Sequence, residues 1–224
     1  MRRCPLCHSD NTTRFYANKK RCLYHCHLCR LVFADANSHL PPSVEQQKYR
    51  QANNKQKPLA RFMLELIDQC EDGQTPLLGL NFGRTLDADT LQKITTRGHQ
   101  LNQYDPSIAP WTGQLKQEYD FICCYRVFEH FRFPYREWAL LSELVKPGGW
   151  IAICTPLLSD LSAFDKWHHK NNLTHVSFYQ RQTFEFLANK VGFKLLFAAN
   201  DLILVQKPSG SDITRDQTSV VVGA

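Results

Sequence analysis

Two stretches of the chain decide its fold: residues 118–130 read EYDFICCYRVFEH, and residues 144–156 read LVKPGGWIAICTP. Each holds a short apolar run, and helical periodicity over residues 135–146 separates the two runs. A buried strand, a helix and a second buried strand are typical of a unit in a parallel sheet. The glycines of the second stretch permit a sharp reversal between the helix and the strand that follows it.

The same alternation extends outward in both directions. Apolar runs recur at Leu77–Leu80 and Leu202–Val205, with helical patterns near 85–97 and 181–190. This order predicts an α/β fold with a Rossmann-like doubly wound sheet. Only four residues separate Leu202–Val205 from the preceding run at Phe193–Phe197, which is too short for a crossover helix. We therefore expect these two runs to form an antiparallel hairpin at the edge of the sheet.

Cysteines near the N-terminus have the spacing of a metal site. Cys4 and Cys7 form one C-x2-C pair, and Cys26 and Cys29 form another after 18 intervening residues. This spacing predicts a structural zinc site, because four thiolates fill a tetrahedral shell and leave no position for catalysis. The alternative is a set of buried cysteines that coincide with this spacing. Three nearby residues could also replace a ligand: Cys22, His25 and His27.

These patterns divide the chain into four parts. We expect a zinc ribbon over 1–35, a linker and amphipathic helix over 36–73, an α/β domain over 74–207 and a disordered tail over 208–224. Residues 1–60 carry 11 Lys and Arg against 3 Asp and Glu, although the whole chain has a net charge of only +6. The basic N-terminal part is compatible with RNA or a phosphorylated substrate, and equally with a solvated basic face.

Composition excludes several classes of protein. With 43% hydrophobic and 21% charged residues, and only 10 Gly and 11 Pro, the chain is neither collagenous nor largely disordered. No run of about 18 apolar residues predicts a membrane span, and no apolar run follows the basic start as in a secretory signal. We therefore expect a cytoplasmic protein with no membrane association, whose cysteines are reduced or bind metal.

The ordered motifs resemble those of class I S-adenosylmethionine (SAM) dependent methyltransferases. The resemblance rests on 118–130, on the Lys-Pro-Gly-Gly turn before the next strand, and on residues 173–179, which read LTHVSFY. One subgroup with an N-terminal four-cysteine zinc module is similar over about residues 1–206. The resemblance implies a SAM-dependent methyltransferase of Rossmann-like fold with a structural zinc.

The cofactor site departs from the family pattern. Where the family has an acidic residue and a Gly-x-Gly-x-Gly loop, this chain has Gly79, Asn81, Gly83 and Thr85, which predicts weak or altered SAM binding. Asp105, at the end of the next strand, is our candidate for binding the ribose hydroxyls; the alternative is an Asp-Pro turn. We add Tyr125 as a cofactor-binding candidate because it lies just past a strand, where ligands bind in such sheets. The candidate cofactor residues are Gly79, Asn81, Gly83, Asp105 and Tyr125.

A shortened segment accompanies the altered loop. Only fourteen residues separate Asp105 from Asp120, which is too few for a helix, a third strand and their loops. We therefore expect a reduced third-strand region and a remodelled adenine pocket.

Glu129, His130 and His175 are the catalytic candidates. Some relatives carry Glu-x-x-Glu-His after this strand, completed by a later His, as a divalent-metal site, but here Arg126 replaces the first Glu. We expect Arg126 to pair with Glu129 and no catalytic metal to bind. For His130 and His175 two interpretations stay open: a general base, or a histidine hydrogen-bonded to backbone near the cleft.

Two functions follow from these patterns. The first is a SAM-dependent methyltransferase whose acceptor is a small molecule or RNA. The second is a catalytically inactive protein of the same fold that binds RNA or a protein through its zinc module and basic N-terminal region.

Overall fold

The computed structural model describes residues 2–52, 56–106, 110–199 and 201–209. Within these ranges, a six-stranded sheet has the order β5-β4-β6-β7-β10-β9. β5, β4, β6 and β7 run parallel, while β10 is antiparallel to both of its neighbours. The strands are β4 (Leu78–Phe82), β5 (Gln100–Tyr104), β6 (Tyr119–Tyr125), β7 (Val145–Cys154), β9 (Lys194–Phe197) and β10 (Leu202–Gln206). The predicted doubly wound α/β sheet and its terminal hairpin are confirmed.

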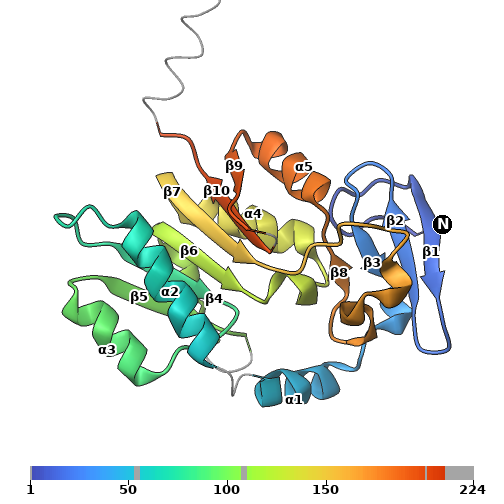
Figure 1. Ribbon diagram of the computed structural model, residues 1–224, viewed down its shortest axis with the longest axis horizontal. Helices are drawn as coiled ribbons and strands as arrows, with labels where there is room; N and C mark the ends of the chain where they lie inside the picture. The colour runs from blue at the N-terminus through green and yellow to red at the C-terminus, as the bar shows by residue number, and fades with distance from the viewer. Residues whose placement is uncertain (1, 53–55, 107–109, 200, 210–224) are drawn as a thin grey trace, which may run out of the picture.

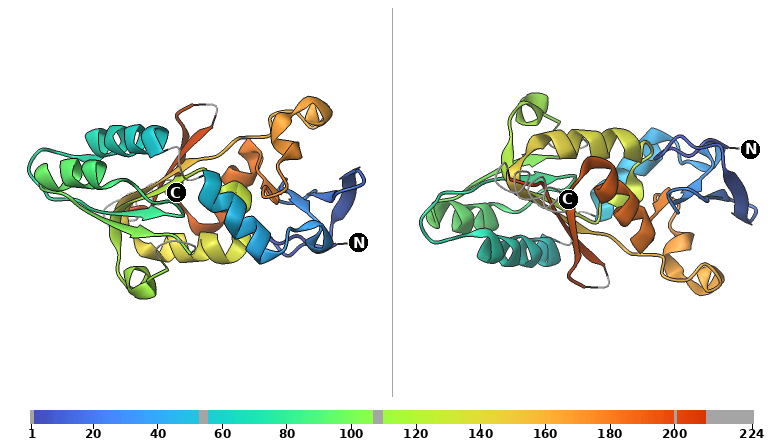
Figure 2. Two further views of the ribbon diagram at one scale, coloured as in Figure 1. Left: turned by 90° about the horizontal axis from the view of Figure 1, so that it is seen from below. Right: turned by 90° about the horizontal axis from the view of Figure 1, so that it is seen from above.

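Helices cover both faces of this sheet (Figures 1 and 2). α2 (Gln56–Cys70) and α3 (Ala88–Thr96) pack on one face through a core that includes Met63, Ile67 and Ile94. On the other face, α4 (Pro134–Leu144) and α5 (Arg181–Val191) bury Trp138, Leu141 and Phe184, among others. The inner strands β6 and β7 are largely buried on both sides, which is why β6 and the second half of β7 read as continuous apolar runs.

The third-strand region is reduced, as expected. Between Asp105 and β6, the described residues form only a short 3-10 segment, η2 (Thr112–Lys116), and β5 is the edge of the sheet. β5 lies on one side of β4 and β6 on the other, so the direction in which the chain adds strands reverses at β4. In open α/β sheets, ligands bind at the carboxyl ends of the strands beside such a reversal.

The N-terminal module has its own small sheet. β1 (Thr12–Ala17), β2 (Cys22–Cys26) and β3 (Val32–Ala34) are antiparallel, and β8 (Ser177–Phe178) adds a fourth strand from the opposite end of the chain. Module residues such as Leu6, Leu31 and Phe33 share one buried cluster with the main sheet. Because this small sheet is completed by β8, the module packs firmly against the α/β domain.

The expected linker is largely helical. After η1 (Ala36–Ser38), α1 (Pro42–Ala52) forms where apolar periodicity predicts no helix, and the predicted amphipathic helix follows as α2. The sequence of α1 is mostly polar, so it has little of the apolar periodicity from which a helix is predicted.

The boundaries of the four predicted parts stay predictions, and residues 210–224 of the expected tail lie outside the described residues. No helix in the described ranges has the length and apolar character needed to cross a membrane.

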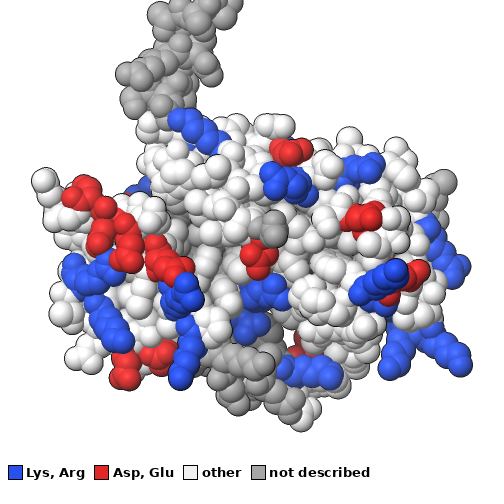
Figure 3. All heavy atoms as spheres, viewed as in Figure 1, with Lys and Arg blue, Asp and Glu red and all other residues white. Residues whose placement is uncertain are grey.

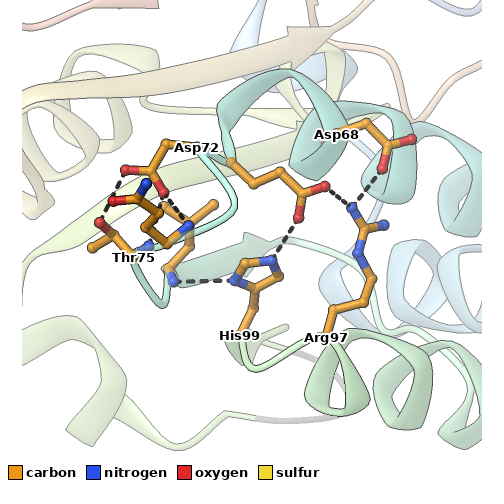
Figure 4. Close-up of polar contacts among 8 residues, drawn as sticks. Asp68, Asp72, Thr75, Arg97 and His99 are labelled. Atoms are coloured by element: carbon orange, nitrogen blue, oxygen red, sulfur yellow. Dashed lines mark hydrogen bonds and ion pairs between the residues drawn. The ribbon is translucent and has the colours of Figure 1, made fainter.

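A polar network connects the segments just before β4 and β5, at the amino ends of these strands (Figure 4). Arg97 bridges Asp68 at 2.6 Å and Glu71 at 2.5 Å, and Glu71 also accepts a hydrogen bond from His99 Nε2 at 2.9 Å. The Leu77 N–H donates to His99 Nδ1 at 3.2 Å, which fixes the tautomer that carries its proton on Nε2. The network therefore joins the end of α2 to the segments that enter β4 and β5.

Candidate active site

A cavity of about 800 Å³ opens at the carboxyl ends of β4, β5 and β6. This volume lies in the range of small-molecule sites. Its walls come from these strand ends, from the loop after β6 and from helix α4. The first turn of α1 covers the cavity. The lining residues on the strand ends and the loop are Phe82, Gly83, Tyr104, Pro106, Val127, His130 and Phe131.

Gly83 is the cofactor candidate that the structure places in the cavity wall. It has a φ of +97°, and a Cβ at this position would collide with the side chain of Val127. Glycine is therefore required both by the backbone conformation and by the close approach of the loop after β6. The resulting bare backbone faces the cavity.

Gly79 and Asn81 serve other purposes in the structure. Gly79 lies within β4 beneath the ring of Phe121, where a Cβ would collide with that ring. Asn81 is fully buried, and its side-chain amide donates to the carbonyl of Arg84 at 2.6 Å, which closes the turn after β4. Neither residue lines the cavity.

Asp105 and Tyr125 also lie outside the cavity lining. Asp105 is completely buried at the end of β5, although its neighbours Tyr104 and Pro106 line the wall. The ring of Tyr125 packs against Phe62 of α2, with 5.4 Å between the ring centroids. Their predicted roles toward a cofactor stay predictions.

His130 is the catalytic candidate that lines the cavity. It ends η3 (Phe128–His130), and its Nδ1 lies 3.0 Å from the carbonyl oxygen of Thr174. Because a carbonyl only accepts, Nδ1 is the donor, and in the neutral ring Nε2 carries the lone pair. Burial lowers the pKa of His130, so the ring is neutral at pH 7. His130 therefore has the protonation state of a general base.

His175 supports His130 from behind and does not line the cavity. The two rings meet edge to face, with 5.0 Å between centroids. His175 is 6% exposed, and burial lowers its pKa to about 2. His175 is thus a buried, neutral histidine that contacts His130 outside the cavity lining, and its predicted catalytic role stays a prediction.

Glu129 pairs with Arg126, as the sequence predicts. Arg126 Nε lies 3.2 Å from Glu129 Oε1, and the Thr155 hydroxyl donates to Oε2 at 2.9 Å. Glu129 is 2% exposed, so the carboxylate is held within the protein. Ligand atoms of Glu129, His130 and His175 also lie within 4.8 Å of one another, close enough to hold a metal ion. The expectation of no catalytic metal stays a prediction.

The four cysteines of the two C-x2-C pairs come together as predicted. Their sulfurs lie within 4.8 Å of one another, with Cys4 and Cys29 at 3.6 Å and Cys7 and Cys26 at 3.4 Å. A tetrahedral zinc with Zn–S bonds of about 2.3 Å separates its sulfurs by roughly 3.8 Å, so the cluster fits this ion. His8 and Arg30, which follow the two pairs, take positive φ values of 61° and 63°, as such turns require. Cys22, His25 and His27 lie outside the cluster.

Contacts from the N-terminal module hold the segment that supports His130. The buried guanidinium of Arg21 donates to the carbonyls of Lys170 at 3.0 Å, Asn172 at 3.1 Å and His175 at 2.5 Å. The Val176 N–H in turn donates to the carbonyl of Glu129 at 2.8 Å. A continuous series of hydrogen bonds thus links the module to the histidine wall.

Several cavity residues were missed by the sequence analysis. α1 contributes Pro42, Ser43, Glu45 and Gln46, and α4 contributes Arg136, Glu137 and Leu140. Glu45 forms an ion pair with Arg132, which tethers the start of α1 to the loop after β6. No sequence signal marked α1 as part of a site, and only the proximity of α4 to the 118–130 motif could have suggested its residues.

Comparison with known proteins defines the class. A family model described as a methyltransferase domain matches residues 26–197. The fold and this match are those of a methyltransferase domain. The chain belongs to this methyltransferase-domain family. No curated protein matches the sequence.

Solved structures share the fold at low sequence identity. An O-methyltransferase family protein from Burkholderia thailandensis is 15% identical with a TM-score of 0.51, over 72% of this chain and 60% of that one. A SAM-dependent methyltransferase from Archaeoglobus fulgidus is 14% identical with a TM-score of 0.49, over 74% and 99%. Human N-acetylserotonin methyltransferase, solved with SAM, is 13% identical with a TM-score of 0.45, over 75% and 57%. The chain thus spans about three fifths of the Burkholderia protein.

Proposed function

We propose that this protein transfers a methyl group from SAM to a hydroxyl or amine of a small molecule or RNA. The observation that carries the proposal is the cavity at the carboxyl ends of β4, β5 and β6, with Gly83 and His130 in its wall. Bare backbone and a neutral histidine in the wall of one cavity suit a ligand that must approach closely and an acceptor that must lose a proton.

The residues present fit the cofactor. Gly83 keeps free the space that a Cβ would fill, and the apolar side chains of Phe82 and Val127 flank it. When bound, SAM supplies an electrophilic methyl group on its sulfonium, so the protein must orient an acceptor and remove one proton. His130 would accept that proton at Nε2, because the Thr174 carbonyl occupies Nδ1.

The cysteine cluster would bind a structural zinc in this proposal. Four thiolates complete a tetrahedral shell, so the metal would stabilise the module and, through Arg21, the His175 segment. The cytoplasmic location stays a prediction.

The experiment that tests catalysis measures transfer of a labelled methyl group. Purified protein and labelled SAM would be incubated with RNA and with small-molecule extract fractions. We expect label in one acceptor class, and a loss of at least about a hundredfold in His130→Gln, which is the usual scale for a missing general base. His168→Gln, an exposed histidine outside the cavity lining, is the control. Equal rates for His130→Gln and the wild type would show that His130 is not the general base.

The second candidate is an inactive protein that binds RNA or a protein partner. It is supported by exposed basic residues on the N-terminal module (Figure 3), namely Arg3, Arg14, Lys19 and Lys20. RNA affinity that falls steeply with salt, without any methyl transfer, would favour this function. RNA binding that does not change with salt concentration would mean that these cations do not contact phosphates and are simply exposed to solvent.

A further inference from the structure

Two aromatic side chains are exposed at the start of α4, beside the cavity. Phe133, the N-cap residue of the helix, is 55% exposed, and Tyr135 in the first turn is 43% exposed. Among the described residues, Trp111 is the other Phe, Tyr or Trp with an exposed side chain. Phe133 also lines the cavity, so it lies where the cavity meets solvent. Exposed aromatic side chains in such a position are typical of binding surfaces.

Each of these rings has a basic side chain beside it. The Arg136 guanidinium lies over the ring of Phe133, at 5.0 Å from its centroid, and also lines the cavity. The Lys190 ammonium of α5 lies over the ring of Tyr135, at 5.4 Å from its centroid. Neither cation forms an ion pair within the described ranges. Their charges are therefore available to an anionic partner.

The N-terminal module extends this surface. The ring of His8 meets that of Tyr135 edge to face, with 4.7 Å between the centroids. Arg3 Nε donates to the His8 carbonyl at 2.8 Å, and both residues are exposed. Arg2 pairs with Asp35, whereas Arg3 has no ion pair in the part of the chain that the structure describes. Three segments far apart in the sequence thus form one surface, which we call the α4 surface: Arg3, His8, Phe133, Tyr135, Arg136 and Lys190.

The carboxyls of the adjoining cavity wall do not neutralise these cations. Two carboxyls line the cavity, those of Glu45 and Glu137. Glu45 is already paired with Arg132. Burial raises the pKa of Glu137 to about 7, so this carboxyl is only partly ionised at neutral pH. The α4 surface therefore combines unpaired cations with exposed aromatic rings.

This combination fits a single-stranded nucleic acid. Unpaired bases stack on exposed aromatic rings, and the phosphates between the bases bind Lys and Arg. A duplex keeps its bases stacked inside, so it could use the cations of the α4 surface but not the rings. RNA commonly presents unstacked bases in loops and at ends, where proteins recognise them by stacking.

We propose that the α4 surface binds single-stranded RNA and places one of its nucleotides at the cavity. This inference rests on the proposed function, in which it makes RNA the methyl acceptor. A base stacked on Phe133 would lie where the cavity meets solvent, and Gly83 and His130 line the same cavity. Tyr135 and the turn of His8 would bind neighbouring nucleotides outside it.

Fluorescence anisotropy tests the rings with a labelled, unstructured single-stranded RNA of about 12 nucleotides. We expect the full-length protein to bind this strand at least about tenfold more tightly than the same sequence in an RNA duplex. Phe133→Ala and Tyr135→Ala should each weaken binding about tenfold, the usual scale for the loss of one stacked base. Phe133→Tyr and Tyr135→Phe keep a ring and should bind as the wild type does. Trp111→Ala, which removes an exposed ring elsewhere, is the control.

The salt dependence of the same binding tests the cations. Arg136→Gln and Lys190→Gln should each reduce the slope of log affinity against log salt concentration by about 0.7, as expected for one phosphate contact on a single strand. Arg14→Gln, on the exposed side of β1, is the control and should leave the slope unchanged.

Several results would overturn the proposal. These are equal affinities for the single strand and the duplex, alanine variants that bind as the wild type does, or a loss of binding in Arg14→Gln alone. Tighter binding of the corresponding DNA strand would assign the surface to DNA instead. Methyl transfer to a small molecule by a protein that binds none of these strands would refute this proposal alone. RNA binding through the α4 surface without methyl transfer would refute the proposed function instead.

Discussion

The two walls of the cavity are built in opposite ways. The histidine wall is supported from outside the α/β domain, because Arg21 of the N-terminal module holds the carbonyls around His175, which in turn contacts His130. The strand wall, formed by the ends of β4 and β5, lacks most of the family's glycine loop and the third-strand region. The comparison teaches that many contacts fix the position of His130, whereas the strand wall offers few groups for the proposed cofactor, chiefly the backbone of Gly83.

The largest expected effect comes from the cysteine cluster. Cys26→Ser should reduce zinc from one per chain to well below half, because zinc affinity depends on all four thiolates. Structural zinc carries about 10–16 kcal/mol of apparent binding free energy, so the module should lose its fold and the histidine wall its support. Metal analysis and unfolding curves would measure this. Cys22→Ser, in the same module but outside the cluster, is the control. One zinc per chain in Cys26→Ser would refute this ligand assignment.

Arg21→Met should be next in size. The substitution leaves the carbonyls of Lys170, Asn172 and His175 without their donor, and the buried carbonyls should cost about 3 kcal/mol in the free energy of unfolding. Denaturant unfolding would measure the loss, and hydrogen exchange should increase over residues 170–176. Arg14→Met, on the exposed side of β1, is the matched control. A difference below about 0.5 kcal/mol between the two variants would show that the module does not support the histidine wall.

Gly83→Ala tests the wall that recognises the cofactor. We expect a loss of about 2 kcal/mol in stability, since the new Cβ meets Val127 and the backbone has a positive φ. Gly73→Ala isolates the backbone part, because Gly73 has a φ of +74° but open space around its Cα. Val127→Ala should partly rescue Gly83→Ala. If Gly73→Ala costs as much as Gly83→Ala, the close approach of Val127 has no energetic role.

Over the first pH unit below about 6.5, the smallest expected effect is a pH dependence of stability. The folded-state pKa of His175 is lowered to about 2 by burial, below the ordinary value of about 6.5. Below pH about 6.5 the unfolded chain therefore binds a proton that the folded protein does not. The free energy of unfolding should fall on acidification, by up to about 1.4 kcal/mol per pH unit for this group. His175→Gln should reduce that slope, whereas the exposed His168→Gln should leave it unchanged. Identical slopes in all three proteins would contradict the burial argument.

Local patterns predicted much of the fold and part of the site. The apolar runs predicted β4, β6, β7 and β10, the short spacing predicted the β9–β10 hairpin, and the C-x2-C spacing predicted the sulfur cluster, because each depends on residues close in sequence. The pairing of Arg126 with Glu129 followed from an i, i+3 spacing in one loop.

Long-range relations could not be predicted in the same way. Nothing near Arg21 indicates that its partners lie about 150 residues away, and nothing in α1 indicates that it covers a cavity. The family pattern also drew attention to Gly79, Asn81 and Asp105, which the structure places in the sheet or its buried end. A motif gives the position of a residue along the chain, but its exposure to the cavity depends on what packs against it.

Hydrogen exchange with and without saturating S-adenosylhomocysteine tests the central claim most directly, because it reports both binding and its location. The account predicts protection of the backbone at 82–84, 104–106 and 127–137, with little change over the basic strand Thr12–Ala17. Unchanged exchange at the ends of β4, β5 and β6 at millimolar ligand would contradict the assignment of this cavity as the cofactor site.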